Sequence, residues 1–156
     1  MMIKKLFLII ILGISNISLA QNSNFIIQVN NEIITDGIIG LKLIYNVDNK
    51  KESSTDLKYV PGNLILNKKL WSKINSDSTN EIILSFNYQT FKKNKNEITN
   101  FQLSLSKNDF KRDYVIIDIY DFRNRKYKKW YQNYTDKNYL VNKVFPGSGI
   151  YPRYVD

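Results

Sequence analysis

The sequence predicts an all-β protein: an antiparallel two-sheet sandwich of Ig-like or transthyretin-like general architecture, with one short helix near residues 67–74. Three observations predict this fold. Several segments alternate apolar and polar residues with a period of two, turn residues separate these segments, and only one short segment has helical spacing. An α+β fold with a larger helix is the alternative.

The first twenty residues have the pattern of a secretory signal peptide. A cationic start with Lys4 and Lys5 precedes an apolar run, and Ser18 and Ala20 place small residues where signal peptidase cleaves. An uncleaved membrane anchor is the alternative, although about nine apolar residues span only half a hydrocarbon core. We therefore expect residues 1–20 to be a signal peptide and residues 21–156 to form a single β-sandwich domain in the periplasm, at the cell surface or outside the cell.

Alternation identifies three strands most clearly, in residues 41–47, 82–91 and 100–106. Residues 25–29 and 114–120 predict two more strands, and residues 126–132 predict a sixth with a more polar face. The apolar positions expected to face the core are Leu41, Leu43, Tyr45, Val47, Ile82, Leu84, Phe86, Tyr88, Phe101, Leu103 and Leu105.

The connections carry turn residues. Residues 47–56 form a polar connector, and residues 92–97 form a charged hairpin loop between two alternating strands. Pro61 and Gly62 fit the two central positions of a type II turn, because proline presets φ and glycine accepts a positive φ. The helix near residues 67–74 begins at Asn67, a favourable N-cap, and its apolar residues recur at a spacing of four.

The absence of two residue types excludes much chemistry. The chain has no cysteine and no histidine, which rules out disulfides, thiol nucleophiles, histidine-based triads and the usual zinc sites. We expect no metal site, no cofactor and no enzymatic activity. A carboxylate-based hydrolase is the remaining enzymatic alternative, and Asp118 is its best candidate because only that acid lies in a strongly apolar segment.

The residues with the clearest binding chemistry lie between positions 123 and 131. This segment holds five cations, three aromatic residues and no acid. We expect residues 121–126 to connect two strands as a hairpin, so that Asp118 faces Lys129 and Tyr120 faces Tyr127. That register puts two lysines and the tryptophan on one face, where they could bind phosphate or sulfate groups and stack on a sugar. The candidate ligand-binding residues are Arg123, Arg125, Lys126, Lys128, Trp130 and Tyr131.

A second interpretation of the same segment stays open. Lysines on an edge hairpin prevent pairing with another chain, and the aromatic residues then serve the core. The formal net charge of +9 also has two explanations. It favours anionic partners, or it follows from A/T-rich codons in a bacterial genome, which enrich a protein in Ile, Lys and Asn. We expect an exported, non-enzymatic protein that binds an anionic glycan, lipopolysaccharide or an envelope protein, with nucleic acid the less favoured partner. A structural or accessory protein of the cell envelope is the alternative.

Overall fold

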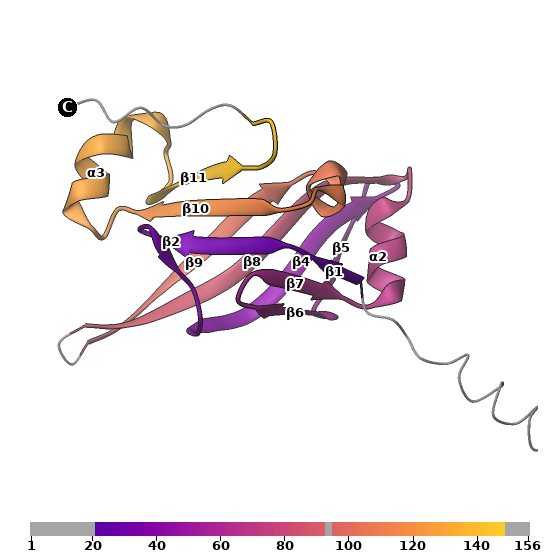
Figure 1. Ribbon diagram of the computed structural model, residues 1–156, viewed down its shortest axis with the longest axis horizontal. Coiled ribbons are helices and arrows are strands. Elements are labelled where there is room, and N and C mark those ends of the chain that lie inside the picture. Colours follow the sequence, from indigo (N-terminus) through magenta and orange to yellow (C-terminus); the bar gives the residue numbers. More distant parts are fainter. Residues whose placement is uncertain (1–20, 93–94, 149–156) are drawn as a thin grey trace, which may run out of the picture.

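The computed structural model describes residues 21–92 and 95–148 (Figure 1). The predicted signal peptide lies outside these residues. The strands are β1 (Gln21–Ser23), β2 (Phe25–Val29), β3 (Glu32–Ile33), β4 (Ile38–Val47), β5 (Lys50–Ser54), β6 (Leu57–Val60), β7 (Asn63–Leu66), β8 (Thr79–Lys92), β9 (Lys95–Leu105), β10 (Val115–Asp121) and β11 (Tyr139–Val144). The helices are α2 (Lys68–Asn75) and α3 (Arg125–Tyr131), with short 3-10 turns η1 (Lys107–Lys111) and η2 (Gln132–Tyr134).

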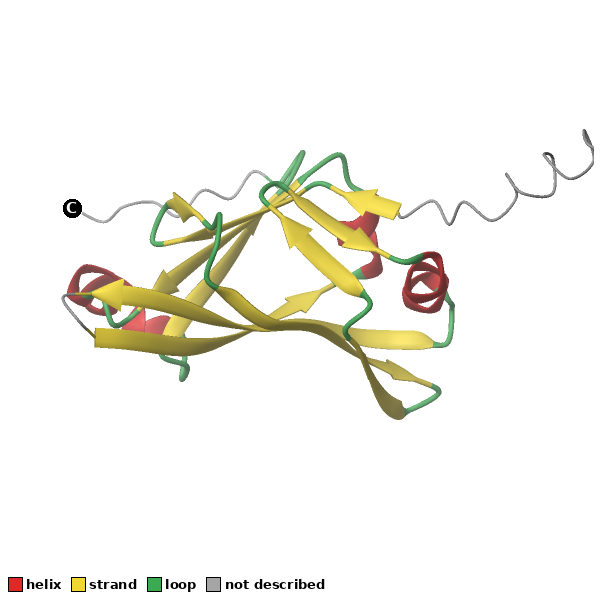
Figure 2. Ribbon diagram, turned by 90° about the horizontal axis from the view of Figure 1, so that it is seen from below, coloured by secondary structure: helices red, strands yellow, loops and turns green. Residues whose placement is uncertain are grey.

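The strands form two layers, which confirms the predicted sandwich (Figure 2). One layer is the long sheet β5-β4-β8-β9, and all its pairs are antiparallel. The other layer combines β1-β7-β6 with β11-β10-β2-β3, because the chain runs from β1 into β2 with only Asn24 between them. The pair β2 and β10 is parallel, an exception to the antiparallel arrangement.

The alternating residues face the core as predicted. Phe86, Phe101 and Leu84 from the long sheet are fully buried, and Phe25 and Ile27 of β2 meet them from the other layer. The rings of Phe86 and Phe101 lie edge to face with centroids 5.7 Å apart. The period-two signal therefore identified the right face of β4, β8 and β9.

The predicted short helix is also confirmed. The side chain of Asn67 caps α2 by accepting a hydrogen bond from the Leu70 backbone N–H at 2.7 Å. Leu70 and Ile74 are buried, as their spacing of four requires. Helix α2 lies at one end of the molecule and α3 lies at the other (Figure 1).

The connectors are shorter than expected. Asp48 and Asn49 have positive φ angles of 48° and 62°, as a two-residue type I′ turn requires, and β5 follows at once. The expected ten-residue polar connector over residues 47–56 was therefore wrong: β5 is polar on both faces, so alternation gives no sign of it. Gly62 has a φ of 88°, as the type II turn predicts.

The hairpin of β8 and β9 extends into the predicted charged loop. The register runs from Ile82 opposite Leu105 to Lys92 opposite Lys95. Residues 93–94 lie outside the described part of the chain. The long hairpin carries two strongly exposed apolar side chains near its end, Phe91 and Ile98.

Candidate functional site

The segment predicted as the sixth strand is a helix. Residues 126–132 were expected to pair with residues 114–120, but residues 125–131 form α3, and β10 pairs with β2 and β11 instead. The side chain of Asn124 caps α3 by accepting from the Lys126 backbone N–H at 3.1 Å. The predicted hairpin at residues 121–126 was therefore wrong.

A cluster of tyrosines holds α3 against the sheet. Tyr127 and Tyr131, one helical turn apart, both pack on Tyr120 of β10, with ring centroids 5.2 and 4.8 Å away. The Tyr127 hydroxyl donates to the backbone oxygen of Asn30 at 3.2 Å and accepts from the Asn31 side-chain amide at 3.0 Å. The predicted proximity of Tyr120 and Tyr127 holds, but it comes from helix packing rather than from strand pairing.

The candidate residues do not share one face. Lys126 and Trp130 are one turn apart, with the lysine Nζ 4.6 Å from the centroid of the tryptophan ring system. Lys128 lies roughly on the opposite side of the helix, because positions two residues apart are separated by about 160°. The predicted face of Lys126, Lys128 and Trp130 was therefore wrong, whereas Lys126 and Trp130 do form a cation–aromatic pair. Trp130 is 36% exposed, which leaves part of the ring accessible.

Arg123 is occupied by acidic partners. Its Nε and one terminal nitrogen lie 2.7 and 2.5 Å from Oδ2 of Asp121, and its other terminal nitrogen lies 3.6 Å from Glu97 on β9. Asp121 also accepts from the Arg123 backbone N–H at 2.9 Å. The carboxylate of Asp121 is almost fully buried, so Arg123 neutralises it and ties the start of α3 to the long hairpin.

The remaining cations of α3 repel one another. Arg125 lies three and four residues before Lys128 and Lys129, and Lys126 lies three before Lys129. Such like-charge pairs together destabilise a short helix by about 1 kcal/mol, and no acidic residue in the first turn opposes the cations there. Within the described residues, Arg125, Lys128 and Lys129 belong to no ion pair. The exposed side of α3 therefore carries positive charge that the protein itself does not neutralise.

A hollow of about 260 Å³ lies beside α3. It is lined by cationic, amide and aromatic side chains: Phe122, Arg123, Lys128, Gln132, Lys137 and Asn138. None of the described acidic residues belongs to this lining. Gln132, Lys137 and Asn138 were not expected at a site. Gln132 follows α3 directly. Lys137 and Asn138 reach the hollow because the Phe122 backbone N–H donates to the Asn138 backbone oxygen at 3.0 Å, a long-range contact that residue spacing does not reveal.

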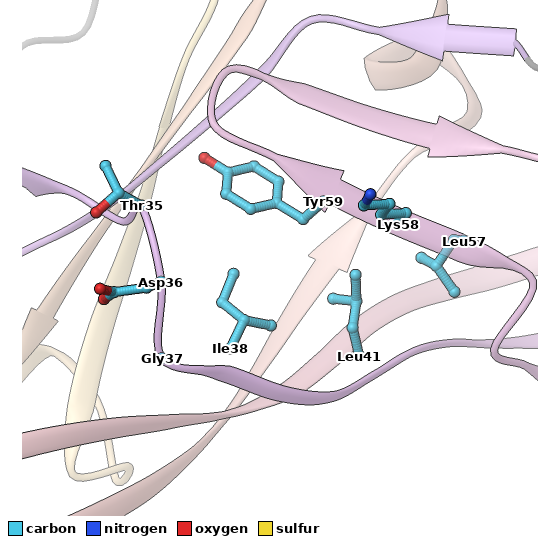
Figure 3. Close-up of a pocket in the computed structure, with 8 residues that line it drawn as sticks. All are labelled: Thr35, Asp36, Gly37, Ile38, Leu41, Leu57, Lys58 and Tyr59. Atoms are coloured by element: carbon cyan, nitrogen blue, oxygen red, sulfur yellow. The ribbon is translucent and has the colours of Figure 1, made fainter.

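A second hollow, of about 340 Å³, lies between β6 and the start of β4. Figure 3 shows Tyr59 between Thr35 and Asp36 on one side and Leu57 and Lys58 on the other, with Ile38 and Leu41 opposite its ring. The Tyr59 hydroxyl accepts from the backbone N–H of Ile27 at 3.1 Å, which fixes the ring. Polar and apolar residues share the lining of this hollow, and one acid and one lysine are among them, so its charge does not favour anions.

Asp118 does not meet Lys129, contrary to the prediction. It lies in a row across three strands, between Gln28 of β2 and Asn142 of β11. Burial raises the pKa of the Asp118 carboxyl above its usual value, and the Asn142 amide offsets part of that rise. Its cross-strand neighbours are both amides, so this row does not supply the second carboxylate that a hydrolase needs.

In residues 21–92 and 95–148, acidic side chains do not gather in threes as a metal site would require. None of the described helices has the length and apolar character needed to cross a membrane.

Comparison with known proteins gives no relative: no family model matches the chain, and neither the curated proteins nor the solved structures gave a match. The surface of α3 must therefore be interpreted from its own geometry.

Proposed function

We propose that this is an exported, non-enzymatic binding protein that uses the exposed side of α3 to hold an anionic glycan of the cell envelope, such as lipopolysaccharide. The observation that carries the proposal is the unneutralised charge of Arg125, Lys128 and Lys129 on one short helix. Export rests on the pattern of residues 1–20 alone.

Two further features support a glycan as the partner. Trp130 is partly exposed beside Lys126, at the edge of the surface nearest Lys129, and an aromatic ring next to a cation suits a sugar ring that bears an anionic group. The charged helix is held on a rigid tyrosine cluster, so the surface is formed before the partner arrives. An anionic partner would also relieve the repulsion within α3, so binding would stabilise the helix.

The test compares two double variants that remove the same charge. Lys126→Ala/Lys129→Ala changes the proposed surface, and Lys68→Ala/Lys69→Ala changes exposed lysines at the start of α2, at the other end of the molecule. Binding to immobilised lipopolysaccharide is measured over a series of salt concentrations. We expect the first variant to bind about tenfold more weakly at low salt and with a shallower salt dependence, because fewer counterions are released. Equal losses in the two variants would show that net charge, and not α3, controls binding.

A structural or accessory envelope protein is a second candidate, and one observation favours it. Phe91 and Ile98, 78% and 59% exposed, lie near the end of the β8 and β9 hairpin, where apolar side chains suit contact with another protein. Replacing both by serine should abolish capture of a stoichiometric envelope protein if this candidate is right, while glycan binding stays unchanged.

A further inference from the structure

The hollow beside α3 differs from the exposed helix surface in being concave and in drawing its side chains from three segments. Arg123 comes from the turn before α3, Lys128 from the middle of the helix, and Lys137 from the segment before β11. In the described chain neither lysine belongs to an ion pair, although the Lys137 Nζ lies 5.4 Å from the ring centroid of Tyr139. The two lysines therefore give the hollow its net positive charge.

The walls of the hollow are fixed by contacts outside its lining. The buried Asp121 carboxylate holds the guanidinium of Arg123. The Phe122 to Asn138 backbone hydrogen bond joins the turn to the segment that carries Lys137, and the backbone N–H of Gln132 bonds to the Lys128 oxygen at the end of α3. A cavity that exists before binding loses little conformational entropy when a ligand enters.

The donors of the hollow suit one kind of anion. The ammonium groups of Lys128 and Lys137 and the amides of Gln132 and Asn138 line it as donors, whereas Asp121 and Glu97 occupy the guanidinium of Arg123. Among the described residues no acid lines it. A carboxylate offers two oxygens in one plane, whereas a sulfate or phosphate ester offers three terminal oxygens that point in different directions. Donors that come from two separate segments, with Lys128 and Gln132 on one and Lys137 and Asn138 on the other, match the second arrangement better.

We propose that this hollow is a subsite for a sulfate or phosphate monoester group on the glycan that α3 holds. The inference rests on the proposed function and extends it, because it names the anionic group that the protein selects. The volume of about 260 Å³ suits one esterified sugar unit rather than a longer segment of chain.

The test uses three polymers that share one backbone: dextran sulfate, phosphorylated dextran and carboxymethyl dextran, with a matched degree of substitution. Affinity is measured by isothermal titration calorimetry. We expect the wild-type protein to bind one or both ester forms about tenfold more tightly than the carboxymethyl form, since each charge-assisted hydrogen bond has a large effect on affinity. The ratio between dextran sulfate and phosphorylated dextran then identifies which ester the hollow takes.

Two double variants separate the hollow from the helix surface. Lys128→Ala/Lys137→Ala should reduce the tenfold preference for esters to nearly one, and it should also weaken carboxymethyl dextran to some extent because Lys128 belongs to the exposed side of α3. Lys126→Ala/Lys129→Ala removes the same charge and should weaken all three polymers while leaving the preference intact. All four lysines are exposed, so circular dichroism should show both variants folded.

The outcomes distinguish the two proposals. If the wild-type protein binds all three polymers equally, or if the Lys128→Ala/Lys137→Ala variant keeps its preference, the subsite is refuted and the proposed function stands. If the wild-type protein binds none of the three polymers and no lipopolysaccharide, both proposals are refuted.

Discussion

Replacing Arg123 by alanine should lower the free energy of unfolding by about 3 kcal/mol. The substitution removes two contacts to Oδ2 of Asp121, at 2.7 and 2.5 Å. Among the described residues, the Arg123 backbone N–H at 2.9 Å is then the one donor left on that carboxylate. Because the Asp121 side chain is 3% exposed, the charge remains buried without its partner. Breaking a buried pair in this way costs about 3–5 kcal/mol, and the lower end applies because Arg123 itself is partly exposed.

Urea unfolding followed by circular dichroism measures this loss. Glu97→Ala is the matched control: it removes the weaker partner of Arg123, at 3.6 Å and in a partly exposed position, and should cost less than about 1 kcal/mol. Asp121→Asn/Arg123→Met removes both charges and should recover much of the stability. An Arg123→Ala variant as stable as the wild type would show that Asp121 does not need the guanidinium, and Arg123 would then be available as a ligand-binding residue in the way the sequence suggested.

Two other predictions follow from single side chains. Burial raises the pKa of Asp118, so the folded state holds the proton more tightly than the unfolded state, and stability falls as pH rises from about 4 through the folded pKa. Asp118→Asn should remove this decline, which is measured as the difference in unfolding free energy between variant and wild type at pH 4 and at pH 7. A variant with the same pH profile as the wild type would contradict the raised pKa. Tyr139→Phe should lower the free energy of unfolding by about 1–3 kcal/mol, measured by thermal or urea unfolding. The Tyr139 hydroxyl accepts from the Gln102 backbone N–H at 2.9 Å and donates to the Gln102 backbone oxygen at 3.2 Å. A loss below about 0.5 kcal/mol would mean that water replaces both hydrogen bonds.

The sequence could predict those parts of the fold that depend on a regular pattern. The strands with one buried face, such as β4, β8 and β9, show the alternation directly, and Asn67 marks the start of α2. Strands β5 and β11 lack that signal: β5 is polar throughout, and most β11 side chains are only half-buried. The alternation of apolar and polar residues detects strands that bury one face. It does not detect strands that are stabilised mainly by backbone pairing.

The error at α3 has a physical cause that the sequence contains. Tyr127, Trp130 and Tyr131 are spaced three and four apart, which is a helical spacing, and Asn124 stands where an N-cap belongs. The alternation of Lys126 and Lys128 with Tyr127 imitates a strand with one polar face. Aromatic spacing was the better guide here, because the aromatic residues are the ones that pack on Tyr120.

The candidate site was only partly predictable. The sequence located the cations and Trp130, and it could not separate Arg123, which Asp121 neutralises, from the cations that have no acidic partner. The sequence also gave no sign of Lys137. This lysine reaches the site because β11 pairs with β10, which brings residue 138 next to residue 122.

Amide hydrogen exchange tests most directly whether the outer side of α3 is the binding surface. The exchange of residues 125–131 is measured by mass spectrometry in the protein alone and with saturating lipopolysaccharide. We predict slower exchange in these residues, because an anionic partner relieves the repulsion among the α3 cations, and unchanged exchange in the distant helix α2. Bound lipopolysaccharide that leaves α3 exchange unchanged, or that protects the β8 and β9 hairpin instead, would contradict the assignment of this surface.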